Sequence, residues 1–329
     1  MSKPICYVGI DVGQAELWVA VADRRPRQFV HTAAGIRALV RFCHAAAPDH
    51  LLHFCLEATG VYGRSLAVRL LQGSHPDVQV SIVNPVQIAA FAKAQLRRTK
   101  TDAVDARVIL AFAQSQTPRP WTPEPAALRE LHQLVAEADA LQAAHRQWSN
   151  RAHTHALTPD RPTAVRCTDR AMLRTVDREL TRIKEAITAL CQGDPTLRQQ
   201  IDLLCTIPGI AQHSAARLLA YGGRAWTTHS AKQLTAHAGL APRHRLSGTS
   251  VRGKSHLAKQ GDAHLRRTLY MPALVASRYN PALKTVYQRL RDGGKPGKLA
   301  IAACMRRLLL IARAVLKQQR PFDPAYGRT

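Results

Sequence analysis

Two periodicities of apolar residues organise the first 117 residues of the chain. The runs ICYVGIDVG and AELWVAVAD are apolar and β-branched, and the Gly-Gln turn between them predicts a β-hairpin. A third strand is expected near residues 28–32, and the runs LLHFCLEA and VQVSIVN predict two buried strands. Helical spacing predicts helices over residues 35–47, 63–71, 86–96 and 101–114. Three strands followed by α-β-α-β-α is the element order of an α/β RNase H-like domain.

A different pattern begins after four prolines between residues 118 and 125, which end this domain. One heptad-like apolar stripe runs from Leu128 to Trp148, and a second runs from Leu173 to Leu190. We interpret the two stripes as an antiparallel coiled-coil hairpin that spaces domains or pairs protomers. From about Leu203 the chain is expected to be mostly helical. The pattern therefore predicts three domains, residues 1–117, 118–200 and 201–329.

The turn in the sequence CTIPGIAQ, at Pro208-Gly209, is expected to join two helices of the last domain. Such a turn can present backbone N–H groups to a phosphate. It can also be no more than a tight connection, which is the interpretation we favour from the sequence.

Charge adds the first functional indication. The chain carries 47 Lys+Arg against 22 Asp+Glu, a net +25, and residues 201–329 contain 22 of the basic and 4 of the acidic residues, a net +18. Self-repulsion of this size does not help a domain to fold, so it indicates a polyanionic partner. Because the excess is spread through a whole domain, nucleic acid is favoured over a membrane surface.

Cysteines and apolar runs exclude several other classes. The seven cysteines are odd in number and never form a C-x-x-C pair, which favours small buried side chains in a reducing compartment over disulfides or a zinc site. No apolar run reaches the ~18 residues that span a bilayer, and the N-terminus lacks the features of a signal peptide. We therefore expect a cytoplasmic protein.

Four acidic residues are candidates for a metal site. Asp11 and Glu57 end apolar strands, where charged residues are rare unless paired or bound to a metal. The sequence KTDAVDA places Asp102 and Asp105 on one helix face. Such neighbouring carboxylates repel unless a cation lies between them, and hard oxygen ligands suit Mg²⁺ or Mn²⁺. Singly, each strand-end acid can face water and the helix pair can serve the helix dipole, but the four together favour a metal.

A second candidate is the basic segment APRHRLSGTSVRGKSHLAKQGDAHLRR, which we expect to be a loop. Ser247 precedes a glycine there and lies among arginines that can bind phosphate bidentately. From the residues alone, Ser247 is a nucleophile, a phosphate donor or a simple loop residue, since no general base is evident nearby. The candidate nucleic-acid-binding residues of this segment are Arg243, Arg245, Arg252, Lys254, Lys259, Arg266 and Arg267.

Together these residues resemble the DEDD insertion-sequence transposases, the Piv-type family also described as bridge-RNA-guided recombinases. The motifs that carry the resemblance are YVGIDVG, LEATG, VNP, KTDAVDAR, IPGI, AGLAPRHRLSGTSVRG and LRRTLYMPA. They cover nearly the whole chain in the expected order. At the turn, the chain has Ala211 where family members often have glycine, which weakens a phosphate-cradling role there.

The resemblance implies a RuvC-like nuclease domain, a coiled-coil linker and a C-terminal transposase domain. It implies that the four acids bind Mg²⁺ and that Ser247 attacks DNA to form a phosphoserine link. It also implies a structured guide RNA that pairs with donor and target DNA, as in other guided systems, and a homo-oligomer working as a dimer of dimers. The expected location is then the bacterial cytoplasm, in association with the nucleoid.

Two other functions remain open from the sequence. One is a metal-dependent junction nuclease in which water attacks and Ser247 only binds phosphate. The other is a non-catalytic nucleic-acid-binding protein that keeps the acids for structure.

Overall fold

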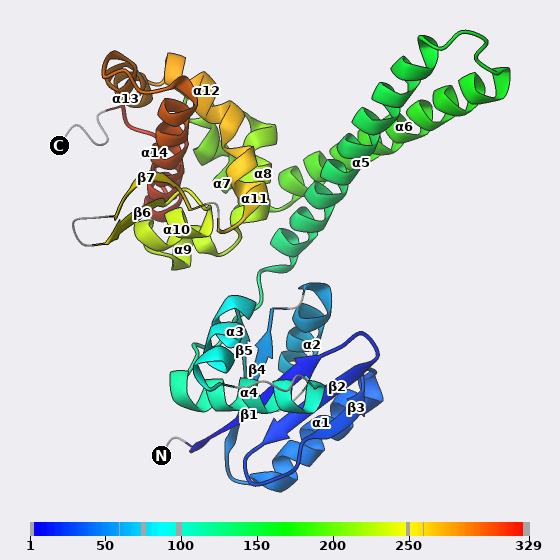
Figure 1. The fold of residues 1–329 in the computed structure, drawn as a ribbon, viewed down its shortest axis with the longest axis vertical. Coiled ribbons are helices and arrows are strands. Elements are labelled where there is room, and N and C mark those ends of the chain that lie inside the picture. Colours follow the sequence, from blue (N-terminus) through cyan, green and yellow to red (C-terminus); the bar gives the residue numbers. More distant parts are fainter. Residues whose placement is uncertain are drawn as a thin grey trace. The chain divides into compact units, whose positions relative to one another are not determined.

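The chain forms two compact units, residues 1–123 and 124–329, in the computed structural model shown in Figure 1. The structure describes residues 3–58, 60–73, 77–96, 101–247, 251–258 and 260–324. Among these, no helix combines the length and the apolar character needed to cross a membrane.

The first unit is built on a five-stranded sheet of order β3-β2-β1-β4-β5. The hairpin β1 (Ile5–Val12) and β2 (Glu16–Val21) is antiparallel and continues to β3 (Arg27–Val30). On the other side of β1, the strands β4 (Leu51–Glu57) and β5 (Val78–Val83) run parallel to it. Parallel pairs require crossovers, and the helices α1 (Ala33–Ala46) and α2 (Gly60–Gln72) supply them.

Alternate residues of β1 face two helical layers. Val8, Ile10 and Val12 lie in a core with apolar residues of α1 and α2. On the opposite face, the sheet packs against α4 (Asp102–Gln116), which also contacts α3 (Pro85–Ala94). The element order and mixed α/β sheet expected from the sequence are confirmed, with each strand and helix starting within a few residues of its predicted position.

The second unit begins with a helical hairpin. Helices α5 (Ala126–Ala156) and α6 (Thr163–Gly193) lie side by side and antiparallel (Figure 1). Leu131, Val135 and Ile187 from the two predicted stripes are buried, but in the same core as the helices that follow. The helical hairpin is thus anchored at its base in the second unit. Its coiled-coil winding and the three-domain division stay predictions.

Eight further helices complete the unit around one apolar core. They are α7 (Pro195–Cys205), α8 (Gln212–Gly222), α9 (Ala225–Thr228), α10 (Ala231–His237), α11 (Ala263–Thr268), α12 (Tyr270–Tyr279), α13 (Pro281–Asp292) and α14 (Gly297–Gln318). The central helix α14 contributes the largest number of buried side chains, and it contacts α7, α9, α10, α12 and α13. The mostly helical character expected for this region is confirmed.

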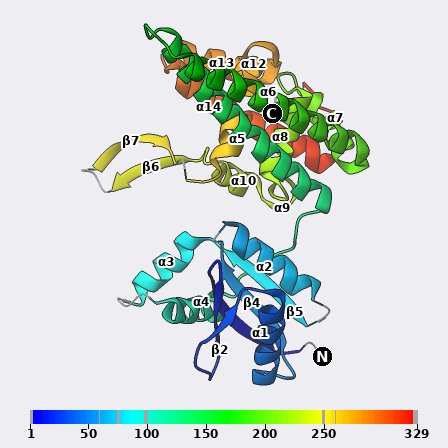
Figure 2. The ribbon, with the colours of Figure 1, turned by 90° about the vertical axis from the view of Figure 1, so that its right-hand side faces the viewer.

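One prediction for this unit is wrong. The basic segment that we expected to be a loop contains an antiparallel pair, β6 (Pro242–Ser247) and β7 (Val251–Leu257), which extends away from the helices of the unit (Figure 2). The strands were missed because polar and basic residues dominate both, and little apolar alternation marks them as strands. The dipeptide Ser247-Gly248 was the available turn signal.

Candidate active site

Two of the four acids lie at the same edge of the sheet. Asp11 is near the end of β1, and Glu57 is the last residue of β4. The parallel register pairs Gly9 with Cys55 and Ile10 with Leu56, so the two acids follow directly on neighbouring strands. Both side chains are half-buried.

The other two acids lie in the first turn of α4. Thr101 caps this helix, its hydroxyl accepting a hydrogen bond from the Val104 N–H at 3.3 Å. Asp102 is exposed and Asp105 is half-buried. The positive end of the helix dipole stabilises both carboxylates here, so their presence alone does not require a metal.

Gly9 sets the distance between α4 and the sheet. A Cβ atom at this position would lie 2.3 Å from the Leu110 nitrogen and 2.4 Å from the Ala106 oxygen, both backbone atoms of α4. Only glycine permits such an approach. Because Gly9 lies two residues before Asp11 on the same face of β1, this close packing brings the first turn of α4 towards Asp11.

The charges of the four acids interact. The pKa of Asp11 is raised to about 6, first by burial and then by the negative charges of Asp102, Asp105 and Glu57. A hydrogen bond from the backbone of Val12 opposes the shift. Three carboxylates on two other elements therefore lie close enough to disfavour the charge on Asp11, and a cation would relieve this repulsion.

The donor set fits a hard divalent cation such as Mg²⁺ or Mn²⁺, because all four groups are carboxylates. Within the described part of the chain, no three His, Cys, Asp or Glu side chains are already close enough to form a metal site. The arrangement is that of an acidic cluster whose members repel, and their side chains would have to move for them to share one ion.

Ser247 is the last residue of β6 and lies opposite Val251 in the backbone register. The register is irregular between Arg243 and Arg245, which indicates a β-bulge. Arg252 and Lys254 belong to β7, so four predicted phosphate-binding residues share one two-stranded ribbon with Ser247. The side chains of residues 243–247 and 251–256 lie outside the described part of the structure, as does the whole of Lys259.

The remaining basic candidates lie on α11. Arg266 is half-buried and donates a hydrogen bond to the Ala238 carbonyl at 3.2 Å, so part of its guanidinium holds α11 near α10. Arg267 is exposed and donates to Nδ1 of His264 at 3.1 Å.

The sequence of this chain matches known protein families in both of its units. Residues 8–158 match the DEDD transposase model of IS110-type elements, described as "Transposase", and residues 201–288 match "Transposase IS116/IS110/IS902 family". The pilin gene-inverting proteins of Moraxella bovis and Moraxella lacunata are 33% and 35% identical to the chain, over 98% of each protein and 98% of this chain. The chain belongs to the IS110/IS116/IS902 family of DEDD transposases. It is a DNA transposase or recombinase, an enzyme that cleaves and rejoins DNA strands.

A more distant relative shows how far the similarity extends. The "Insertion element IS900 uncharacterized 42 kDa protein" of Mycobacterium paratuberculosis is 30% identical over 189 residues, 57% of this transposase and 45% of that protein. The DEDD family model includes β1, β4 and α4, which carry the four acids. Family members of this kind use divalent metal ions, in agreement with the donor set.

The Pro208-Gly209 turn has a packing role in the transposase. Gly209 has a φ of +105°, and a Cβ atom there would lie 2.8 Å from the Pro272 oxygen and from two atoms of Ala276. Glycine is therefore required by the contact with α12, and no phosphate is needed to explain it. This geometry supports the interpretation of the turn as a tight connection.

The sequence did not reveal a polar junction between the helical hairpin and α8. Asp139 of α5 accepts hydrogen bonds from Arg217 at 2.8 Å and from the Tyr221 hydroxyl at 2.6 Å, and the ring of His264 stacks on Tyr221 at 4.9 Å. Burial raises the pKa of Asp139, but the hydrogen bonds from Arg217 and Tyr221 outweigh it, so that its pKa lies below the ordinary value.

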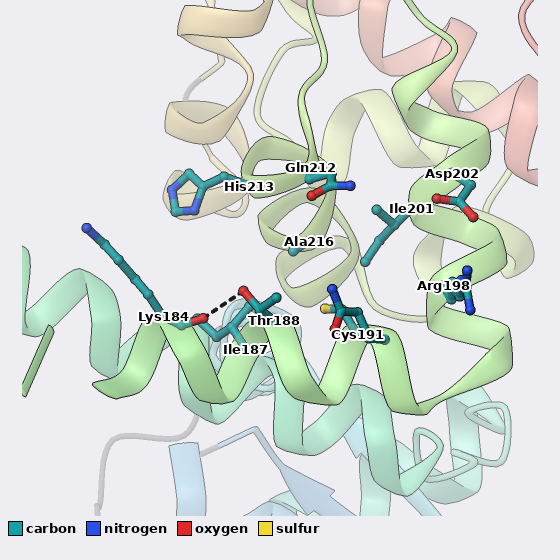
Figure 3. Close-up of a pocket in the computed structure, with 11 residues that line it drawn as sticks. Lys184, Ile187, Thr188, Cys191, Arg198, Ile201, Asp202, Gln212, His213 and Ala216 are labelled. Carbon is teal, nitrogen blue, oxygen red and sulfur yellow. Dashed lines mark hydrogen bonds between the residues drawn. The ribbon is translucent and has the colours of Figure 1, made fainter. Parts of the chain in front are cut away.

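A cavity of about 570 Å³ lies beside this junction, between α6, α7 and α8 (Figure 3). Lys184 and Arg198 line it, together with His213, whose pKa is lowered by burial and then by the charges of Arg217 and Lys184. Asp202 lines the same cavity, so the lining is mixed in charge and identifies no ligand.

Proposed function

We propose that the transposase cuts and rejoins DNA with Mg²⁺ or Mn²⁺ held by Asp11, Glu57, Asp102 and Asp105, and with Ser247 as the nucleophile. The metal proposal rests on the placement of the four acids: Asp11 and Glu57 lie at the ends of neighbouring strands, and Asp102 and Asp105 lie in the first turn of α4, which packs on the sheet at Gly9. The raised pKa of Asp11, to which the charges of the other three contribute, is consistent with it. A bound divalent ion would neutralise this cluster and stabilise charge developing on the phosphate oxygens.

Ser247 supplies the covalent step in this proposal. Its hydroxyl oxygen attacks the phosphorus, the bond to one deoxyribose oxygen breaks, and a phosphoserine link preserves the energy of the phosphodiester. A deoxyribose hydroxyl of another strand then displaces the serine and restores the phosphodiester. The support is the place of Ser247 at the end of a ribbon that carries Arg243, Arg245, Arg252 and Lys254, which can bind phosphate.

The serine needs help to lose its proton. His244 is its only neighbour in β6 that can act as a base, because the arginines stay protonated. We propose that a divalent ion held by the acidic cluster would instead lower the pKa of the hydroxyl, which requires Ser247 and the cluster to act on one phosphate, within one chain or between chains.

The same proposal includes a structured guide RNA and a homo-oligomer, a dimer of dimers, acting on donor and target DNA. The support is the net +18 of residues 201–329, which fits a polyanion but does not distinguish RNA from DNA. Sequencing the RNA that co-purifies with the protein tests the guide, because a guide encoded beside the gene must match its flanks. Random cellular RNA in that fraction would contradict it.

A denaturing gel of labelled DNA incubated with protein and Mg²⁺ tests the nucleophile. Wild-type protein is expected to give a covalent protein–DNA adduct, and Ser247→Ala is expected to bind DNA without forming one. An adduct that persists in Ser247→Ala would assign the attack to Ser250, Ser255 or Tyr270. Cleavage without any adduct would identify a nuclease that uses water.

Mixing two inactive variants tests how the groups combine. If the cluster and the serine of different chains act together, Ser247→Ala protein mixed with Asp11→Ala protein regains some recombination. No recovery in mixed oligomers would place both groups in one chain.

A further inference from the structure

The outward side of α12 carries an unusual set of exposed side chains. Tyr279 is 71% exposed, Met271 59%, Tyr270 44% and Val275 40%. Arg278 is exposed beside them. We call these five residues the outer face of α12.

The opposite side of the same helix is buried in the core. Ala273 and Ala276 are buried completely, and α12 packs against α13 and α14 (Figure 1). Gly209 contacts α12 on this buried side. The exposure of the outer face therefore belongs to a firmly held helix, and the aromatic side chains cannot turn inward to escape water.

Helical geometry groups the five residues on one half of the helix surface. At 100° per residue, Met271, Val275 and Arg278 lie near its centre, and Tyr270 and Tyr279 lie at its two edges. The two tyrosines are separated by about 13 Å along the axis. Nine residues at 100° each also place them about 180° apart around the axis, so a strand that reaches both must cross the outer face of α12 obliquely.

The charge around this face indicates which partner it accepts. Arg278 is the charged residue of this face, and α11 and α12 together carry Arg266, Arg267 and Arg278 and no Asp or Glu. A second copy of the same face would bring two copies of Arg278 to one interface, with no acidic side chain on either α12 to pair them. A polyanion with flat apolar surfaces matches both the arginine and the exposed aromatic rings.

Unpaired nucleotides combine negative charge with exposed, flat base surfaces, whereas a duplex offers the charge without the exposed base surfaces. In a duplex the base faces are stacked on each other, so a protein tyrosine gains little beyond phosphate contacts. Unpaired bases stack on exposed aromatic side chains, and cationic side chains bind the accompanying phosphates.

We propose that the outer face of α12 is a stacking platform for unpaired nucleotides of DNA or RNA. This inference does not depend on the metal cluster or on Ser247, because it concerns binding and can be measured without divalent ions.

The test is fluorescence anisotropy of the full-length protein with labelled 12-nucleotide single strands and a matched duplex, without divalent metal. The double variant Tyr270→Ala/Tyr279→Ala is expected to lose about 30-fold or more in affinity for single strands, and less than about 2-fold for the duplex. The double phenylalanine variant keeps the rings and should bind like wild type. Leu157→Ala is a matched control, because Leu157 is 72% exposed elsewhere in the same unit.

Salt titration separates stacking from charge. The tyrosine variants should leave the slope of log affinity against log salt unchanged, whereas Arg278→Gln should reduce its magnitude by about 0.7 on single strands. Single-stranded DNA and RNA probes tested in parallel show which source binds more tightly. Equal losses for single strands and duplex, or no loss for either, would overturn the proposal. A change of oligomeric state with unchanged affinity would instead identify a protein-docking surface and would also overturn it.

Discussion

At the scale of one residue, the fold raises the pKa of Asp11 by burying its carboxylate near three other acids. Its carboxylate is half-buried at the end of β1, and its pKa of about 6 reflects burial first and three neighbouring acids second. The folded protein therefore holds a proton on Asp11 that the unfolded chain releases at lower pH. Without a bound cation, the charged cluster opposes folding at neutral pH.

Asp11→Asn is expected to raise the stability of the metal-free protein. The pKa shift from 3.8 to about 6 sets an upper limit of about 3 kcal/mol, and solvent screening of a half-exposed group reduces the gain to about 1 kcal/mol. Because the folded pKa is raised, the penalty is absent below about pH 4 and complete above about pH 6. Urea unfolding with EDTA at pH 4, 6 and 8 measures it. A loss of stability at pH 8 would contradict the repulsion between the acids.

Gly9→Ala is expected to damage both the fold and the site. The new Cβ would meet backbone atoms of α4 at 2.3 and 2.4 Å, so the helix must move, at a cost of about 2–3 kcal/mol or more. Displacing α4 by even 1 Å moves Asp102 and Asp105, which can lower activity about 100-fold. Unfolding and strand-cleavage assays measure the two effects. Gly193→Ala is the control, since no atom lies within 4 Å of a Cβ there, and equal behaviour of the two variants would exclude a positioning role for Gly9.

At the scale of elements, one carboxylate joins the helical hairpin to the rest of its unit. Asp139 of α5 accepts hydrogen bonds from Arg217 and Tyr221 of α8, and all three side chains are largely buried. Apolar contacts around Leu131 and Val135 support the same junction. The hairpin is therefore held at its base by both packing and charge.

Asp139→Asn is expected to destabilise the second unit by about 2–3 kcal/mol, because Arg217 is left without its charged partner. Tyr221→Phe should cost about 1 kcal/mol, the worth of one hydrogen bond. The pKa of Asp139 is lowered, so the contribution of its charge is present above about pH 4 and is lost as the pH falls through the lower folded pKa. In a double-mutant cycle measured by urea unfolding, Arg217→Met should add less to Asp139→Asn than it costs alone. Strict additivity would show that the pair does not interact.

The elements differ in how well the sequence predicted them. The strands β1, β4 and β5 and the two long helices were predictable because their apolar periodicity is strong and caps or prolines mark their ends. The ribbon β6–β7 was not, because its apolar residues are only Pro242, Leu246, Val251 and Leu257. The four acids were predicted as metal ligands from their places at strand and helix ends, and the structure places them at those ends. The Asp139 junction had no such signal, since its partners lie 78 and 82 residues away.

At the scale of the whole molecule, charge is divided unequally along the chain. Residues 1–123 carry 14 basic and 8 acidic residues, a net +6, and residues 124–200 carry 11 and 10, a net +1. The remaining +18 falls on residues 201–329. Nonspecific attraction to phosphate should therefore come mainly from the last segment, whereas the nearly neutral helical hairpin contributes little.

Paired charge-neutralising variants of the full-length protein test this division. Lys284 and Arg289 are exposed on α13, and Arg170 and Arg174 are exposed on α6. Replacing the α13 pair with glutamine should reduce the magnitude of the salt slope for duplex DNA by up to about 1.8, because each neutralised phosphate releases ~0.9 counterion. The α6 pair, changed in the same way, should leave the slope within about 0.3 of wild type. Both variants remove two charges from exposed helix positions, so a general effect of net charge would shift the two slopes equally. A larger change for the α6 pair would show that nucleic acid lies along the helical hairpin and that net charge does not locate the binding surface.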